Sequence, residues 1–114
     1  MIIVYGIPNC DSVRKARAWL AEQGLAYRFH DFKKAGVPEA QLDDWLERFG
    51  WERVINRRGT SWHRLPAEER EAMDAVRARA AALANPSLIK RPVVESDSNS
   101  LIGFDADDWQ ESLA

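Results

Sequence analysis

The order of the predicted elements indicates an α/β fold in which a small mixed sheet is flanked by helices. A strand, a helix and a second strand fit within residues 1–32, and such a βαβ unit makes a parallel, right-handed strand pair. Near the end of the chain, two short apolar runs separated by a polar turn predict a hairpin, followed by a last helix. A hairpin that extends a parallel pair makes the sheet mixed.

The first strand and the helix after it give the clearest pattern. Residues 2–5 are an apolar run typical of a buried strand, because β-branched and aromatic side chains fit a covered, pleated position. Residues 6–9 (Gly-Ile-Pro-Asn) predict a turn. Apolar residues at helical spacing then predict a helix over residues 11–23, which ends at Gly24.

The middle of the chain predicts a second strand and a second helix. The alternation of aromatic and polar residues over 25–32 favours the strand. Residues 33–38 are expected to form a loop. A helix over residues 38–50 follows, with one apolar stripe and a glycine at its end. Residues 51–66 are the least regular segment and mix arginines with aromatic side chains.

The last part of the chain predicts a long helix, a hairpin and a short helix. Residues 67–84 are expected to be helical with a break near Asp74, because eighteen residues is long for so small a domain. The hairpin pairs strands at 93–95 and 101–104, and Asp105 caps the final helix. This order of elements is the thioredoxin arrangement, which independently expects a reactive cysteine after the first strand.

Cys10, the only cysteine of the chain, falls where the first strand gives way to the helix. The free N–H groups of a helix's first turn carry partial positive charge and favour an anion, here a thiolate. Asp11 or Ser12 could cap this helix, although the charge of Asp11 opposes thiolate formation, so nearby cations would help. We interpret Cys10 as a nucleophile rather than as a small packing residue.

The composition is that of an ordinary soluble globular protein. With 114 residues, the chain suits one compact domain, expected to span residues 1–114. The 16 cationic and 18 acidic residues give a net charge of −2, so no global basic field favours nucleic acid or a membrane. The apolar runs are strand-sized and no secretory leader is visible. Together with the single cysteine, this predicts a reducing, cytoplasmic setting.

Several motifs together resemble a known family. They are residues 5–20 around Cys10, 56–62 (Asn-Arg-Arg-Gly-Thr-Ser-Trp), 89–92 (Ile-Lys-Arg-Pro) and 101–104 (Leu-Ile-Gly-Phe). In this order, and over essentially the whole chain, they resemble the arsenate-reductase (ArsC) family and its Spx relatives, most closely the YffB branch. The resemblance implies a thioredoxin-like fold with a helical insertion before the hairpin.

The resemblance also implies the residues of a site. It implies a nucleophile at Cys10, a cis peptide bond between Arg91 and Pro92 beside it, and a second oxyanion-facing arginine at Arg58, with Arg57 as a neighbour that could share this role. A guanidinium stabilises a thiolate and binds a carboxylate or oxyanion through two parallel N–H bonds. The residues expected to bind substrate or glutathione are Asn9, Asp11, Ser12, Arg57, Arg58, Arg91 and Pro92.

Three positions depart from the pattern of the relatives. Gly6 and Phe104 stand where true arsenate reductases have a histidine and an arginine, so two groups that would handle arsenate are missing. Val13 stands where Spx-type regulators have a second cysteine. An internal disulfide therefore cannot form, and the resolving thiol must come from another molecule, such as glutathione or a glutaredoxin.

These observations predict a glutathione-dependent thiol reductase that acts on a small thiol-reactive or oxyanion substrate. No bound cofactor or metal, no nucleic acid and no membrane partner is expected, and the chain is expected to be a monomer. His30 and His63 lack metal-ligand spacing and are interpreted as structural or surface residues. Two alternatives stay open, an Spx-like regulator that binds RNA polymerase and an arsenate reductase proper.

Overall fold

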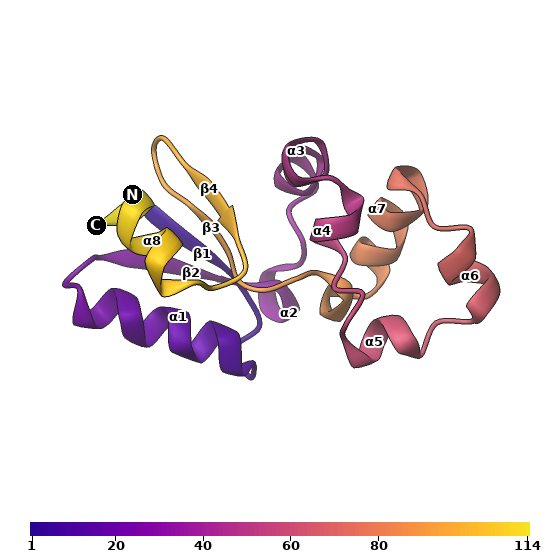
Figure 1. Ribbon diagram of the computed structural model, residues 1–114, viewed down its shortest axis with the longest axis horizontal. Coiled ribbons are helices and arrows are strands. Elements are labelled where there is room, and N and C mark those ends of the chain that lie inside the picture. Colours follow the sequence, from indigo (N-terminus) through magenta and orange to yellow (C-terminus); the bar gives the residue numbers. More distant parts are fainter. The chain divides into compact units, whose positions relative to one another are not determined.

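A computed structural model describes all residues from 1 to 114, and the chain forms two compact units (Figure 1). The first unit contains Met1–Ala35 and Arg91–Ala114, and the second contains Gly36–Lys90. The second unit is thus inserted between the two pieces of the first. The expectation of one domain over residues 1–114 stays a prediction.

The first unit contains a four-stranded mixed sheet. Its strands are β1 (Ile2–Gly6), β2 (Tyr27–Asp31), β3 (Val93–Glu95) and β4 (Ser100–Ile102), in the spatial order β2-β1-β3-β4. β1 runs parallel to β2 and antiparallel to β3, and β3 pairs antiparallel with β4. The predicted parallel pair, extended by a hairpin, is therefore confirmed.

Two helices cover one face of this sheet, α1 (Asp11–Glu22) and α8 (Ala106–Leu113) (Figure 1). The fully buried side chains between these layers are Val4, Ala16, Leu20, Val94 and Trp109. The indole N–H of Trp109 donates to the carbonyl oxygen of Gly103 at 3.1 Å, so the ring is buried without an unsatisfied donor. This packing fixes α1, and with it the position of Cys10 at its start.

The second unit is helical. Its elements are α3 (Glu39–Phe49), α4 (Trp51–Val54), α5 (Thr60–His63), α6 (Ala67–Glu71), α7 (Ala75–Ala84) and the 3₁₀ turn η1 (Pro86–Leu88). Its buried apolar side chains are Leu42, Trp45, Val54, Ile55, Ala78, Ala82, Leu88 and Ile89. An isolated antiparallel bridge pairs Ile55, directly after α4, with Ile89 near the end of the unit.

The structure places short helices in the predicted loop over residues 33–38 and in the irregular segment over residues 51–66. The expected loop over residues 33–38 is partly helical, because α2 (Phe32–Ala35) begins directly after β2. Asp31 starts this turn, since its Oδ1 accepts the backbone N–H of Lys33 at 2.8 Å. The irregular segment 51–66 contains α4 and α5, each a single turn that sequence periodicity does not register.

Two boundary predictions have clear outcomes. The break near Asp74 is confirmed, and its cause is a cap: Oδ1 of Asp74 accepts the backbone N–H of Arg77 at 2.8 Å and starts α7. The last strand ends at Ile102 rather than at Phe104, because Gly103 has a φ of 76° and leaves the extended conformation there. None of the helices combines the length and the apolar character that crossing a bilayer requires.

Candidate functional site

Cys10 is the N-cap residue of α1. Its backbone is extended (φ −144°, ψ 127°), its carbonyl oxygen accepts the N–H of Arg14 at 2.9 Å, and its side chain makes no capping hydrogen bond. The thiol is free and partly exposed. The sulfur therefore sits at the end of α1 where the helix dipole favours negative charge. This is the position predicted from the strand–turn–helix pattern.

Arg14, which was not predicted as a site residue, contacts two of the predicted binding residues. Its Nη1 donates to Oδ1 of Asn9 at 3.2 Å, and its Nη2 forms an ion pair with Asp11. Asp11 therefore does not cap α1, nor does the exposed Ser12. Because Arg14 lies one helical turn from Asp11, it partly neutralises the carboxylate that would otherwise oppose a thiolate. The i, i+3 spacing of Asp11 and Arg14 on a predicted helix could have indicated this ion pair from the sequence.

Arg91 is placed by the peptide bond to Pro92, which is cis, as the resemblance implied. Pro92 is buried, and its carbonyl oxygen accepts the backbone N–H of Gly103 at 2.8 Å. The Nε and Nη1 atoms of Arg91 are buried and have no hydrogen-bond partner. Burying part of a guanidinium without partners is costly unless an acceptor binds it. Arg91 is therefore the guanidinium of the first unit best suited to hold an anionic group.

The positions that depart from the relatives have structural roles of their own. A Cβ at Gly6 would lie 2.8 Å from Cγ2 of Val13, which is closer than two carbon atoms can pack. A histidine at position 6 therefore does not fit opposite Val13. Phe104 packs edge-on against Trp109, with ring centroids 5.0 Å apart, and lies 6.4 Å from the ring of Trp19. At both positions the residue present serves close packing, and neither residue has a side chain that can bind an anion.

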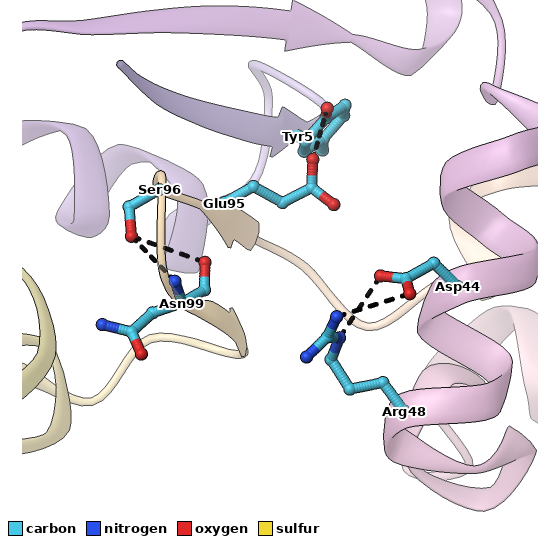
Figure 2. A network of polar contacts seen from close by, with 6 residues as sticks. All are labelled: Tyr5, Asp44, Arg48, Glu95, Ser96 and Asn99. Atoms are coloured by element: carbon cyan, nitrogen blue, oxygen red, sulfur yellow. Dashed lines mark hydrogen bonds and ion pairs between the residues drawn. The ribbon is translucent and has the colours of Figure 1, made fainter.

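Tyr5 in β1 and Glu95 in β3 form a hydrogen-bonded polar pair. The hydroxyl of Tyr5 donates to Oε1 of Glu95 at 2.8 Å (Figure 2). Burial raises the pKa of Tyr5 above its ordinary value, the hydrogen bond and charge of Glu95 add to this, and Arg28 opposes it. Tyr5 therefore stays protonated as a donor. From the sequence, Tyr5 was predicted only as part of a buried strand.

Arg57 and Arg58 belong to the second unit. They line a cavity of about 430 Å³ together with Glu52, Arg53, Ile55, Asn56 and Lys90. Arg53 and Lys90 were not selected from the sequence, because they are separated from each other along the chain and share no motif. Neither histidine lines this cavity: His30 packs its ring against Tyr5 and Phe32, and His63 is exposed at the end of α5. The structure contains no cluster of three His, Cys, Asp or Glu residues arranged to hold a metal ion.

Comparison with known sequences gives matches along the whole chain. The profile of the ArsC family matches residues 5–112. An uncharacterized protein of Haemophilus influenzae is 38% identical over 114 residues, which cover 100% of each chain. The global transcriptional regulator Spx of Streptococcus pyogenes is 30% identical over 118 residues, which cover 100% of this chain and 86% of Spx.

Comparison with solved structures agrees. The YFFB (PA3664) protein is 40% identical and superposes with a TM-score of 0.95 over 100% of both chains. An arsenate reductase (ArsC) related protein from Brucella melitensis is 43% identical, with a TM-score of 0.78 over 98% of this chain and 92% of that one. The arsenate reductase from Vibrio cholerae, at 20% identity and a TM-score of 0.81, shares the fold.

Proposed function

The chain belongs to the ArsC family, and on this premise we propose that it is a glutathione-dependent thiol reductase whose nucleophile is Cys10. The family comprises thiol-dependent reductases together with Spx-type regulators. The observation that carries the proposal is the placement of a free, partly exposed thiol at the N-cap of α1, where no side chain competes for the helix terminus.

The proposed chemistry is thiol–disulfide exchange. The Cys10 thiolate attacks one sulfur of a disulfide substrate, forms a mixed disulfide with it and expels the other half as a thiolate. The thiolate of glutathione then attacks the substrate sulfur of this mixed disulfide, so Cys10 leaves as a thiolate and a glutathione disulfide forms. One cysteine suffices, because glutathione or a glutaredoxin supplies the second thiol. Cys10 is regenerated unchanged, so both electrons come from glutathione: a second glutathione thiolate attacks the mixed disulfide of glutathione and substrate, releases the substrate half as a thiolate and forms oxidised glutathione.

Arg91 and Arg58 are proposed to stabilise negative charge on the thiolate and on the bound substrate or glutathione. The partnerless nitrogens of Arg91 support a role in binding the anionic part of the substrate or of glutathione and in stabilising the thiolate. Arg58 lies in the second unit, and its proposed role as an oxyanion-binding arginine rests on the family resemblance. The backbone N–H groups at the start of α1 are proposed to help stabilise the thiolate. Asn9, Asp11, Ser12, Arg57 and Pro92 complete the proposed binding residues.

The proposal is tested by the pH dependence of Cys10 alkylation, measured with iodoacetamide and mass spectrometry. We expect the wild-type thiol to react at lower pH than a free thiol does, and the profile of Arg91→Ala to move to higher pH. Arg48→Ala is the matched control, because Arg48 is an exposed arginine of α3 paired with Asp44. Profiles of wild type and Arg91→Ala that both coincide with a free thiol would reduce Cys10 to a packing residue.

Activity gives a second readout. With a small disulfide as substrate and glutathione as reductant, Cys10→Ser should fall to the uncatalysed rate while the circular dichroism spectrum stays unchanged. Full activity in Cys10→Ser would rule out the proposal.

The Spx-like alternative is supported by the 30% identity to a transcriptional regulator along the whole chain. Val13 stands in the place of that group's second cysteine, which weighs against a redox switch of the same design. A pull-down with the RNA polymerase α subunit distinguishes this role from the reductase.

Arsenate reduction proper is the third candidate, and Gly6 and Phe104 weigh against it because both residues serve packing and neither has a side chain that can bind an anion. Glutathione-dependent release of arsenite would be its readout.

A further inference from the structure

The second unit contains a basic cavity, defined by Glu52, Arg53, Ile55, Asn56, Arg57, Arg58 and Lys90. We propose that this basic cavity binds a small anion that carries two or three negative charges, either a phosphoanhydride or a polycarboxylate. Its volume of about 430 Å³ falls in the range of small-molecule sites and is too small for a macromolecule to enter.

The charges around the basic cavity are not balanced within the chain. Four cations and one carboxylate line it, so the local charge is 4 − 1 = +3. None of these cations forms an ion pair. Three other arginines of the same unit are paired, Arg48 with Asp44 (Figure 2), Arg77 with Asp74, and Arg79 with both Glu39 and Asp43, whereas Arg64 and Arg70 form no ion pair and do not line the cavity. A ligand of two or three negative charges would supply the missing compensation.

Backbone hydrogen bonds bring the two charged segments together. The N–H of Asn56 donates to the carbonyl oxygen of Leu88 at 2.8 Å, and the N–H of Lys90 donates to that of Val54 at 2.8 Å. These bonds flank the bridge between Ile55 and Ile89, whose side chains are 1% and 0% exposed. Lys90 is thus held beside the arginine-bearing segment by a buried, rigid element rather than by a mobile loop.

The loop that carries Arg57 and Arg58 is fixed by Asn56 and Gly59. Oδ1 of Asn56 accepts the backbone N–H of Arg58 at 3.3 Å, and the N–H of Gly59 donates to the carbonyl oxygen of Asn56 at 3.1 Å. A Cβ at Gly59 would lie 2.8 Å from Nδ2 of Asn56. The absence of a side chain at Gly59 therefore permits the compact turn.

Aromatic rings position two of the guanidinium groups. Arg57 lies over the ring of Trp51, with 5.6 Å from Cζ to the ring centroid, and Arg53 lies over Phe49 at 5.3 Å. Stacking uses the face of a guanidinium and leaves its in-plane N–H groups able to bind an oxyanion in two parallel hydrogen bonds. The rings therefore reduce the rotamer freedom that binding would otherwise cost.

This inference rests on the second unit alone and does not require the chemistry of Cys10. Arg57 and Arg58 are the two lining residues that it shares with the reductase proposal, so the deciding variant is Lys90→Gln, because Lys90 has no part in that proposal. Cys10→Ser should bind the anion as wild type does, which separates failure of this inference from failure of the proposed function.

The test is titration calorimetry with pyrophosphate and with citrate, at constant ionic strength held by potassium chloride. We expect saturable binding of at least one of them, with the affinity reduced about tenfold or more by Arg57→Gln and by Lys90→Gln, because each removes one charged hydrogen-bonding partner. Arg48→Gln should bind as wild type does. Tighter binding of pyrophosphate would identify the ligand of the basic cavity as a phosphoanhydride, and tighter binding of citrate would identify it as a polycarboxylate. Equal affinities would show that the cavity binds anions of this charge without distinguishing the two classes.

Two controls keep the test decisive. If Arg57→Gln or Lys90→Gln is poorly folded, Arg57→Lys and amide shift perturbations of the wild-type chain replace it, and the shifts should centre on residues 52–58 and 90. No saturable binding of either anion, binding unchanged in both variants, or shifts centred elsewhere would overturn the inference.

Discussion

At the scale of single residues, the contact between Gly6 and Val13 links two positions that look independent in the sequence. Gly6 ends β1 and Val13 lies in the first turn of α1. Because a Cβ at position 6 would lie 2.8 Å from a methyl carbon of Val13, the two residues share one volume. Val13 therefore restricts position 6 to a residue without a side chain.

This coupling predicts a non-additive pair of mutations. Gly6→Ala should lower the free energy of unfolding by about 1–3 kcal/mol through overpacking. In Val13→Ala the extra methyl group has space, so the double variant should be more stable than the sum of the two single effects, by about 0.5–3 kcal/mol. Urea unfolding of the four proteins measures this. Additivity within about 0.5 kcal/mol would contradict the shared volume.

The hydrogen bond from Tyr5 to Glu95 predicts a pH dependence of stability. The pKa of Tyr5 is raised in the folded state, so the folded chain keeps the hydroxyl proton at pH values where the unfolded chain loses it. The stabilisation is thus fully present below pH ~10, the ordinary tyrosine pKa, and is lost as pH rises above it. In urea unfolding at increasing pH, wild type should lose stability relative to Tyr5→Phe above this value.

Tyr27→Phe is the matched control, because it retains Tyr5 and should follow wild type. At neutral pH, Tyr5→Phe should cost about 1–3 kcal/mol for the lost hydrogen bond to a carboxylate. A parallel alkaline loss in wild type and Tyr5→Phe would show that Tyr5 does not carry the effect.

At the scale of elements, the helix termini decide where the chain changes direction. Cys10 begins α1 without a side-chain cap, whereas Asp74 and Asp105 cap α7 and α8 through backbone N–H groups. Two helices that serve packing have their first-turn donors satisfied by a carboxylate. Helices α3, α4, α5 and α6 also lack a side-chain cap, so what distinguishes α1 is the thiol of Cys10 at its uncapped terminus.

The cap of α8 predicts a measurable loss of stability. Oδ1 of Asp105 accepts the N–H groups of Asp107 at 2.9 Å and Asp108 at 3.2 Å, and α8 carries the fully buried Trp109. Asp105→Ala should lower the free energy of unfolding by about 0.5–2 kcal/mol, while Asp105→Asn, which retains an acceptor, should stay near wild type. Thermal unfolding followed by circular dichroism compares them. Equal losses in both variants would assign the effect to charge rather than to capping.

At the scale of the whole molecule, the two units raise the question of how cooperatively the chain unfolds. The first unit is discontinuous in sequence, since β1 pairs with β3 across the inserted second unit. Unfolding the second unit would lengthen the flexible connection between these strands and lower the stability of the sheet. Folding of the two units is therefore expected to be coupled.

Coupling predicts one transition in urea. Trp109 is buried in the first unit and Trp45 in the second, so variants that keep only one of these two tryptophans, in a background without the other three, report on each unit separately. We expect coincident midpoints for both fluorescence signals and for circular dichroism. Separate midpoints would show two domains in place of the single one predicted for residues 1–114.

The sequence alone determined the parts of this protein that depend on local chemistry. The apolar run of the first strand, the helix that follows Cys10, the break at Asp74 and the cap at Asp105 are each set by neighbouring residues, and each is confirmed. The short helices α2, α4 and α5 were not predicted, because a single turn is too short to show periodicity.

Only the tertiary structure decided which distant residues act together. The collision between Gly6 and Val13, the pairing of Tyr5 with Glu95, and the buried, partnerless nitrogens of Arg91 depend on how strands and helices pack. The joining of Lys90 to Arg53 and Arg57 around one cavity depends on a bridge between segments far apart in the chain. Such contacts follow from through-space packing, which local propensity and spacing along the chain do not encode.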